Sequence, residues 1–190
     1  MSSSPPQSLV DIARRTESHL SAFLAVEEAR WSGFDTDLAS PVAEIRRLVA
    51  SGGKRLRPAF CHWGFVGAGG DPDSQVSLDT GAALELLHAF ALFHDDIMDG
   101  SLTRRGAAVT HEVFADQHRL TGGSGEARRY GEGIAILVGD LAFVYSDQLI
   151  GDASLAAREI WHELRIELNI GQLLDLIGTS LNERRRYKTE

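Results

Sequence analysis

The sequence predicts an all-α fold in which helices pack around a shared core. Apolar residues recur at helical spacing along most of the chain, and the alternating Val, Ile or Thr stretches that would indicate strands are nearly absent. The 43% share of hydrophobic residues is enough for a substantial core, and a length of 190 residues suits one domain. We therefore expect an all-α bundle of buried helices.

Capping residues, prolines and glycines divide the chain into helices. Ser40 followed by Pro41 is typical of a helix start, Pro58 can begin the next helix, and Ser154 can cap the last one. The segment 118–133 carries five glycines, which favours a flexible loop. The expected helices cover about 8–30, 41–49, 58–66, 74–98, 134–149 and 155 onward.

We expect one helical domain, 8–190, after a short disordered Ser/Pro-rich tail, 1–7. The tail lacks the features of a secretory signal, and Glu85 and His88 interrupt the longest apolar run, so no membrane span is expected. The net charge of −8 argues against nucleic-acid binding. The single cysteine, Cys61, excludes an internal disulfide and fits a reducing, cytoplasmic location.

A cluster of aspartates, Asp95-Asp96-Ile97-Met98-Asp99, ends the apolar helix expected over 74–98. Asp95 and Asp99 lie about 40° apart on a helical wheel, so their carboxylates share one face. A hard divalent cation would remove their repulsion, and Mg²⁺ typically takes one or two carboxylates together with substrate phosphates. The alternative is a solvated acidic helix end, which the helix dipole disfavours at a C-terminus.

Two histidines precede these aspartates. His88 lies about 20° from Asp95 on the same wheel, which leaves a functional role and a core role equally open. His94 has no such alignment and is expected to be structural.

Two basic segments flank the aspartates in the sequence. The first is Ser51-Gly52-Gly53-Lys54-Arg55-Leu56-Arg57-Pro58, and the second is Arg104-Arg105-Gly106. Glycines permit close backbone approach, and a helix start beside Lys and Arg is typical of an anion site. The alternatives are a basic surface loop for the first segment and salt bridges to the aspartates for the second. If the two segments converge in space, the site suits a diphosphate held by Mg²⁺ on one side and guanidinium groups on the other.

Together these motifs resemble the trans-isoprenyl diphosphate synthase (polyprenyl synthetase) family, of the geranylgeranyl diphosphate synthase type. The resemblance covers about residue 40 to the end, and the matching segments occur in the family's order and spacing. They are Gly52–Pro58, Glu85–His88, His94–Asp99 continuing to Arg104–Gly106, Gly139-Asp140, Gly171–Asp175 and Lys188-Thr189.

The resemblance implies an isoprenoid-synthase-type bundle around a central cavity, a homodimer, and a prenyltransferase that uses Mg²⁺. Such an enzyme condenses isopentenyl diphosphate with an allylic diphosphate to give a longer all-trans prenyl diphosphate. By resemblance, Asp95 and Asp99 would bind Mg²⁺ and, with Arg104 and Lys188, form the catalytic set. Arg104 and Lys188 would hold the allylic diphosphate, with Thr189 beside the reacting carbon. Isopentenyl diphosphate would contact Lys54, Arg57, His88 and Arg105, and Gln172 would also contact substrate.

The family's second Asp-rich motif does not occur in these 190 residues. We therefore expect the N-terminal part of a synthase, or else a short homologue, with weak or no activity of the chain alone. A non-catalytic diphosphate-binding partner subunit of a full-length synthase remains an alternative. A terpene cyclase is less well supported, since cyclases bind no second diphosphate substrate and generally lack the Gly52–Pro58 loop.

Product length and helix geometry give two further expectations. Phe90, five residues before Asp95 and next to the small Ala91, resembles synthases that make a C20 product, with C15 and longer products open. If Gln172 and Lys188 both face the pocket, the last helix must kink or break between them, and Gly178 is the candidate position.

Overall fold

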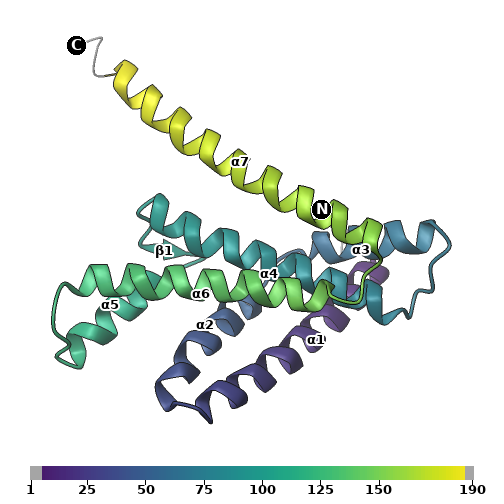
Figure 1. The fold of residues 1–190 in the computed structure, drawn as a ribbon, viewed down its shortest axis with the longest axis horizontal. Coiled ribbons are helices and arrows are strands. Elements are labelled where there is room, and N and C mark those ends of the chain that lie inside the picture. Colours follow the sequence, from purple (N-terminus) through teal and green to yellow (C-terminus); the bar gives the residue numbers. More distant parts are fainter. Residues whose placement is uncertain (1–5, 187–190) are drawn as a thin grey trace. The chain divides into compact units, whose positions relative to one another are not determined.

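The computed structural model describes residues 6–186, with the side chains of residues 6–179, and it confirms the all-α prediction. Its elements are α1 (Gln7–Ser32), the 3₁₀ helix η1 (Thr36–Leu38), α2 (Ala39–Ala50), α3 (Leu56–Gly67), α4 (Gln75–Met98), β1 (Thr103–Arg104), β2 (Ala107–Ala108), α5 (Thr110–Leu120), α6 (Ala127–Ile150) and α7 (Leu155–Arg186) (Figure 1). The chain divides into two compact units, 1–150 and 151–190, which are described separately.

Two helices begin earlier than the prolines predicted. The 3₁₀ helix η1 continues directly into α2, so Leu38 rather than Ser40 is the residue before the helix. Helix α3 begins at Leu56, and Pro58 lies within its first turn, where the missing backbone N–H costs little. In both cases helical structure begins before the proline, and the proline is not the first helical residue.

The predicted loop over 118–133 is wrong in most of its length. Helix α5 extends to Leu120 and α6 begins at Ala127, so only 121–126 connects them. Gly131 lies inside α6. The residue at this position must be glycine, because a Cβ there would stand 2.1 Å from the carbonyl oxygen of His111. This glycine permits α5 and α6 to approach each other and does not mark a loop. The sequence also gave no signal for α5 or for the short hairpin of β1 and β2.

The core of the first unit lies between α1, α2, α4 and α6. Helix α4 runs beside α6 and contributes Leu86 and Phe93, whose side chains are almost completely buried (Figure 1). Burying each large apolar side chain stabilises the fold by about 1.5–3 kcal/mol. The cluster consists of Leu20, Leu24, Ile45, Val49, Ala82, Leu86, Ala89, Phe93, Val138, Ala142 and Tyr145. Helix α4 is therefore a rigid support for any polar side chain that it carries.

The second unit contains one long helix, α7. The backbone N–H of Ala157 donates to Ser154 Oγ at 3.2 Å, which confirms the predicted cap. Helix α7 continues past Gly178 without a break, so the break considered there does not occur in the described residues.

Helices α4 and α6 are both long and apolar enough to cross a membrane, judged by length and composition alone. They pack against each other, and 50% and 39% of their most apolar windows are buried. Central helices of soluble proteins share these properties, so the two helices are weak support for a span.

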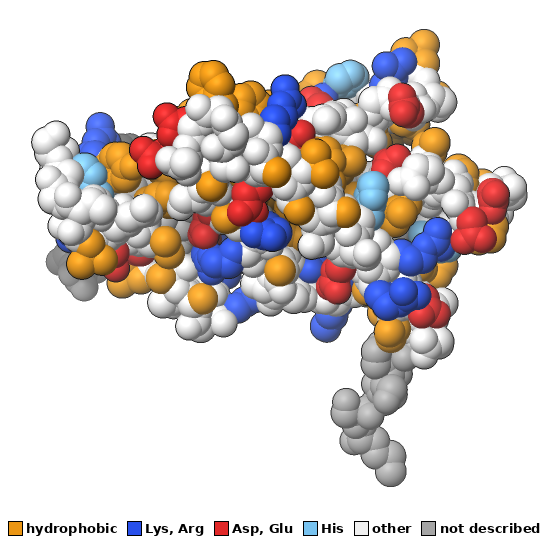
Figure 2. Space-filling view, turned by 90° about the horizontal axis from the view of Figure 1, so that it is seen from below, with side chains coloured by type: hydrophobic (Ala, Val, Ile, Leu, Met, Phe, Trp, Pro, Cys, Tyr) orange, Lys and Arg blue, Asp and Glu red, His pale blue; other side chains and the backbone are white. Residues whose placement is uncertain are grey.

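The surface carries charges of both signs. On the face shown in Figure 2, acidic and basic side chains are interspersed with apolar ones, and no extended basic area covers the described residues there.

Candidate anion pocket and carboxylate pair

Two glycines and an arginine shape the loop between α2 and α3. Gly52 and Gly53 have φ angles of +88° and +152°, which residues with a Cβ rarely adopt. Arg55 has a φ of 46° and turns its side chain into the protein, where the residue is 6% exposed. Its neighbours Lys54 and Arg57 remain exposed. The loop therefore buries one cation and presents two others.

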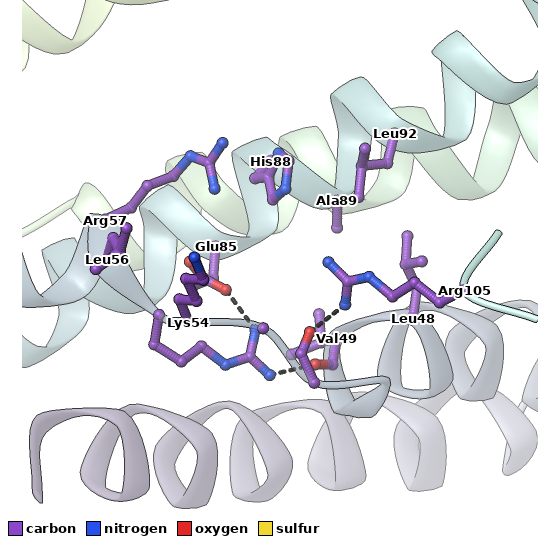
Figure 3. A pocket seen from close by; sticks show the side chains of 13 residues that line it. Leu48, Val49, Lys54, Leu56, Arg57, Glu85, His88, Ala89, Leu92 and Arg105 are labelled. Atoms are coloured by element: carbon purple, nitrogen blue, oxygen red, sulfur yellow. Dashed lines mark hydrogen bonds and ion pairs between the residues drawn. The ribbon is translucent and has the colours of Figure 1, made fainter. Parts of the chain in front are cut away.

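Lys54 and Arg57 line a pocket of about 110 Å³ between this loop, α4 and the turn after β1. His88 on α4, Arg105 in the turn and the buried Arg55 also line it, and Figure 3 shows Lys54, Arg57, His88 and Arg105 around the same space. The volume is well below the roughly 300–1,000 Å³ of a pocket for a drug-sized ligand. The pocket therefore suits a charged head group and not a complete large ligand.

The turn after β1 brings Arg105 to this pocket. The hairpin pairs Thr103 with Ala108 and Arg104 with Ala107, and Arg105 takes a left-handed φ of 52° at its tip. Arg105 Nη1 donates to Ser51 Oγ at 3.1 Å and also to the carbonyl oxygen of Gly52. The two basic segments that flank the aspartates in the sequence thus converge, as the diphosphate hypothesis required.

His88 is half-buried in this basic surrounding. Burial lowers its pKa from 6.5 to about 4, with further lowering by the positive charges of Arg57, Arg105, Arg104 and Arg55 in that order. The imidazole is therefore neutral at pH 7 and can still donate one hydrogen bond to an anion.

The one carboxylate among the pocket's described lining residues, Glu85, is already paired. Arg55 Nη1 donates to Glu85 Oε2 at 2.5 Å, and Arg55 Nε donates to Glu17 Oε1 at 3.0 Å. Sequence reasoning assigned no role to Arg55 or Glu17. The available signal was Glu85 itself, because a carboxylate in an apolar helical run needs a buried cation.

The carboxylates at the end of α4 take different positions. Asp96 is buried and accepts from Arg104 Nε at 2.9 Å, and Arg104 Nη2 lies 3.4 Å from Asp95 Oδ2. The N–H of Asp99 donates to the Asp95 carbonyl at 2.8 Å, so helical geometry continues to Asp99. Asp95 and Asp99 therefore occupy one face as predicted, with Asp95 half-buried and Asp99 exposed. The salt bridges considered for the second basic segment form with Arg104, whereas Arg105 faces the pocket.

This carboxylate pair fits Mg²⁺ held in part by a ligand. The described residues contain no group of three or more His, Cys, Asp or Glu side chains arranged around a common metal position. Mg²⁺ is usually bound by one or two carboxylates with waters and substrate phosphates completing its shell. Asp95 and Asp99 supply such oxygens beside the cationic pocket.

The remaining predicted residues are less directly placed. Gln172 is half-buried on α7 in the second unit, and Lys188 and Thr189 lie outside the described residues. His94 has the structural surroundings expected of it: its Nε2 lies 3.2 Å from the Ile136 carbonyl oxygen, and its ring faces Gly139 closely.

Fold and site together define an all-α protein with a pocket suited to a phosphorylated head group next to a carboxylate pair. A sequence model of the polyprenyl synthetase family matches residues 42–190. The chain belongs to the polyprenyl synthetase family.

Named relatives agree with this assignment. The chain is 30% identical over 158 residues to the short chain isoprenyl diphosphate synthase of Methanothermobacter thermautotrophicus, covering 80% of this chain and 43% of that protein. It is 35% identical over 108 residues to the geranylgeranyl diphosphate synthase of Cyanophora paradoxa, covering 56% and 30% respectively. The chain thus spans less than half the length of either relative.

The fold matches a solved enzyme of the same type. The geranylgeranyl pyrophosphate synthase of Corynebacterium glutamicum, complexed with isoprenyl diphosphate and magnesium, superposes with a TM-score of 0.83 at 33% identity. The match covers 90% of this chain and 51% of that chain. The expected isoprenoid-synthase-type helical fold is therefore confirmed.

Proposed function

We propose that the protein to which these residues belong is a prenyltransferase that condenses isopentenyl diphosphate with an allylic diphosphate. The observation that carries this proposal is the pocket formed by Lys54, Arg57, His88 and Arg105 from three separate segments of the chain. Family membership supports the reaction class, and the complex of the Corynebacterium enzyme with isoprenyl diphosphate and magnesium supports a diphosphate substrate and that metal.

The pocket would hold the diphosphate of isopentenyl diphosphate. Lys54, Arg57 and Arg105 would supply charge-assisted hydrogen bonds, and neutral His88 would add one donor. Arg55 neutralises Glu85, so the lining offers a net positive field to the anion. This arrangement would fix the substrate's charged end.

Asp95 and Asp99 would hold the Mg²⁺ that serves the allylic diphosphate. Bound Mg²⁺ supplies positive charge that stabilises the departing diphosphate. Arg104 is a permanent cation, since its hydrogen bond to Asp96 raises its pKa further, and it lies beside the same carboxylates. Lys188, Thr189 and Gln172 would complete the allylic site, as the resemblance implies. Preorganised cations at a leaving group are usually the largest catalytic contribution.

An apolar wall would protect the allylic cation from water. Ala89 and Leu92 of α4 line the pocket together with its basic groups, and Ala89 also belongs to the hydrophobic core of the first unit. Such a wall excludes water from the reacting carbons.

Product length is the finer part of the proposal. Phe90 packs against Phe143, with ring centroids 4.7 Å apart, and lies between α4 and α6. We expect a C20 product limited by this aromatic pair, made by a cytoplasmic homodimer. Phe90→Ala in the active protein should lengthen the product, and an unchanged product would contradict the assignment of Phe90.

The test is a prenyl-transfer assay with Mg²⁺, isopentenyl diphosphate and a labelled allylic diphosphate, on the protein produced from its gene and on the 190-residue chain. We expect activity in a protein of larger intact mass, and weak or no activity in the 190-residue chain. If the protein has the intact mass of 190 residues, shows no prenyl transfer and forms a stable complex with a full-length synthase, the partner-subunit function is favoured instead. Cyclic products from a single allylic substrate would favour the cyclase.

A further inference from the structure

Arg55 is the one arginine of the Gly52–Arg57 loop that is buried, although it also contributes to the lining of the pocket. Its side chain is 5% exposed, and the Glu85 side chain that it contacts is 6% exposed. A buried arginine–glutamate pair is weak evidence for stability, because desolvation offsets much of the attraction. Its position directly below the anion pocket calls for a different explanation.

The guanidinium of Arg55 joins three helices. It donates to Glu17 of α1 at 3.0 Å, to Glu85 of α4 at 2.5 Å, and to the carbonyl oxygen of Val49 near the end of α2. Glu17 lies outside the residues that match the family model, 42–190. The first helix thus contacts the loop through a residue that the family match does not include.

The contacts of Arg55 also determine where its neighbours in the loop lie. Lys54 precedes it directly, and Arg57 follows two residues later in the first turn of α3. Arg55 has a left-handed φ of 46°, which is costly for a residue with a Cβ, so the loop keeps this shape only while the buried contacts hold it. Displacing Arg55 would move both exposed cations away from His88 and Arg105.

From this geometry we infer that Arg55, held by Glu17 and Glu85, is a positioning residue that sets the affinity of the pocket for a diphosphate. It orients Lys54 and Arg57, and it cancels the negative charge of Glu85 beneath the bound anion. This inference rests on the proposed function, since it assumes that the pocket binds a diphosphate.

The test compares inorganic diphosphate binding, by isothermal titration calorimetry, in the full chain and in R55M/E85Q. The double variant removes both buried charges together, so no unpaired buried charge remains to unfold the protein. We expect a cooperative thermal transition and binding about tenfold weaker than wild type, as loss of an aligned charge-assisted contact produces. We also expect the pKa of His88, followed by NMR in R55K, to rise from about 4 toward its ordinary value as Arg57 withdraws, because lysine keeps the positive charge that Arg55 itself places near His88. A purely structural role for Arg55 would leave both quantities unchanged.

The matched control is R46M/E28Q. Arg46 Nη2 and Glu28 Oε2 lie 2.7 Å apart and also link α2 to α1, but neither residue lines the pocket. Its diphosphate affinity should stay within about twofold of wild type, because this ion pair has no contact with the anion pocket or with the Arg55 hydrogen bonds. R55K provides a second test if the double variant fails to fold, since lysine keeps the charge but cannot reach three acceptors, and it too should bind more weakly.

The outcomes separate the two proposals. The inference is overturned if wild type and folded R55M/E85Q bind diphosphate equally. If the double variant is unfolded, equal binding by wild type and R55K overturns it instead. Either result leaves the proposed function intact. Failure of the wild-type chain to bind diphosphate overturns the assigned pocket and the inference with it.

Discussion

The guanidinium of Arg105 donates a hydrogen bond of 3.1 Å to the hydroxyl of Ser51, although 54 residues separate the two in the chain. This contact joins the tip of the hairpin to the loop that precedes α3. It brings Arg105 to the same pocket as Lys54 and Arg57, which lie near Ser51 in the sequence (Figure 3). The convergence of the two basic segments depends on it.

Arg105→Lys should weaken diphosphate binding several-fold. Lysine keeps the positive charge but lacks the planar fork that lets Arg105 contact the loop and an anion together. Calorimetric titration with inorganic diphosphate measures the change. Arg119→Lys is the matched control, because Arg119 pairs with exposed Asp116 on α5. This variant should bind diphosphate as tightly as wild type. Equal affinities of the two variants for diphosphate would contradict a role of Arg105 in the pocket.

His88 should make the folded protein sensitive to acid. Its pKa is about 4 in the folded state and 6.5 in the unfolded state, so the unfolded chain binds more protons as the pH falls from 6.5 to 4. The free energy of unfolding should therefore decrease through that window. Thermal unfolding at several pH values measures it, and His88→Gln should remove this part of the pH dependence.

A diphosphate in the pocket should reverse the shift at His88. Its negative charge offsets Arg57 and Arg105, so the pKa of His88 should rise on binding and the complex should take up protons between pH 6.5 and 4. An NMR titration of the imidazole with and without inorganic diphosphate follows this directly. A pKa of His88 that is insensitive to saturating diphosphate would place the anion elsewhere.

Two glycines of α6 should respond oppositely to alanine. Gly131→Ala should destabilise the protein by about 1–3 kcal/mol, because its Cβ would stand 2.1 Å from the His111 carbonyl oxygen. Gly133→Ala should stabilise it by roughly 0.5–1 kcal/mol, since no neighbouring atom lies within 4 Å and alanine favours helix. Denaturant unfolding of both variants checks the pair. Similar effects of the two substitutions would contradict the close packing of α5 on α6.

Asp95→Asn and Asp99→Asn should remove the dependence of allylic diphosphate binding on Mg²⁺. Both carboxylates lie on one face at the end of α4, and their loss removes the protein oxygens available to the ion. Titration of a non-hydrolysable allylic diphosphate with Mg²⁺ and then with EDTA measures the effect. Isopentenyl diphosphate binding should persist, and Asp116→Asn on α5 should behave like wild type.

The sequence predicted what depends on local patterns. Helical spacing identified α1, α4 and α7, and the wheel placed Asp95 and Asp99 on one face. The loop predicted over 118–133 was wrong because a glycine is also a loop signal in sequence. Gly131 instead permits the close packing of α5 on α6, which is a tertiary requirement. Likewise, a 3₁₀ turn ahead of α2 moved its start before Pro41.

The site was predicted in part for a similar reason. Charge patterning identified the two basic segments, and the family resemblance selected Lys54, Arg57 and Arg105 within them. The charge pattern alone could not distinguish these residues from Arg55, which is buried. That distinction depends on Glu17 and Glu85, whose approach to Arg55 is fixed only by the packing of α1 and α4. In the same way, Asp96 resembles Asp95 in sequence, yet it is buried against Arg104.

Titration of the chain with isopentenyl diphosphate tests the central claim most directly. Wild type and Lys54→Met/Arg57→Met should be compared by calorimetry at one ionic strength, with thermal unfolding as a check that both are folded. Saturable binding by wild type and binding at least about tenfold weaker in the double variant is the predicted result. Equal affinity of the two folded proteins would contradict the assignment of this pocket to the diphosphate.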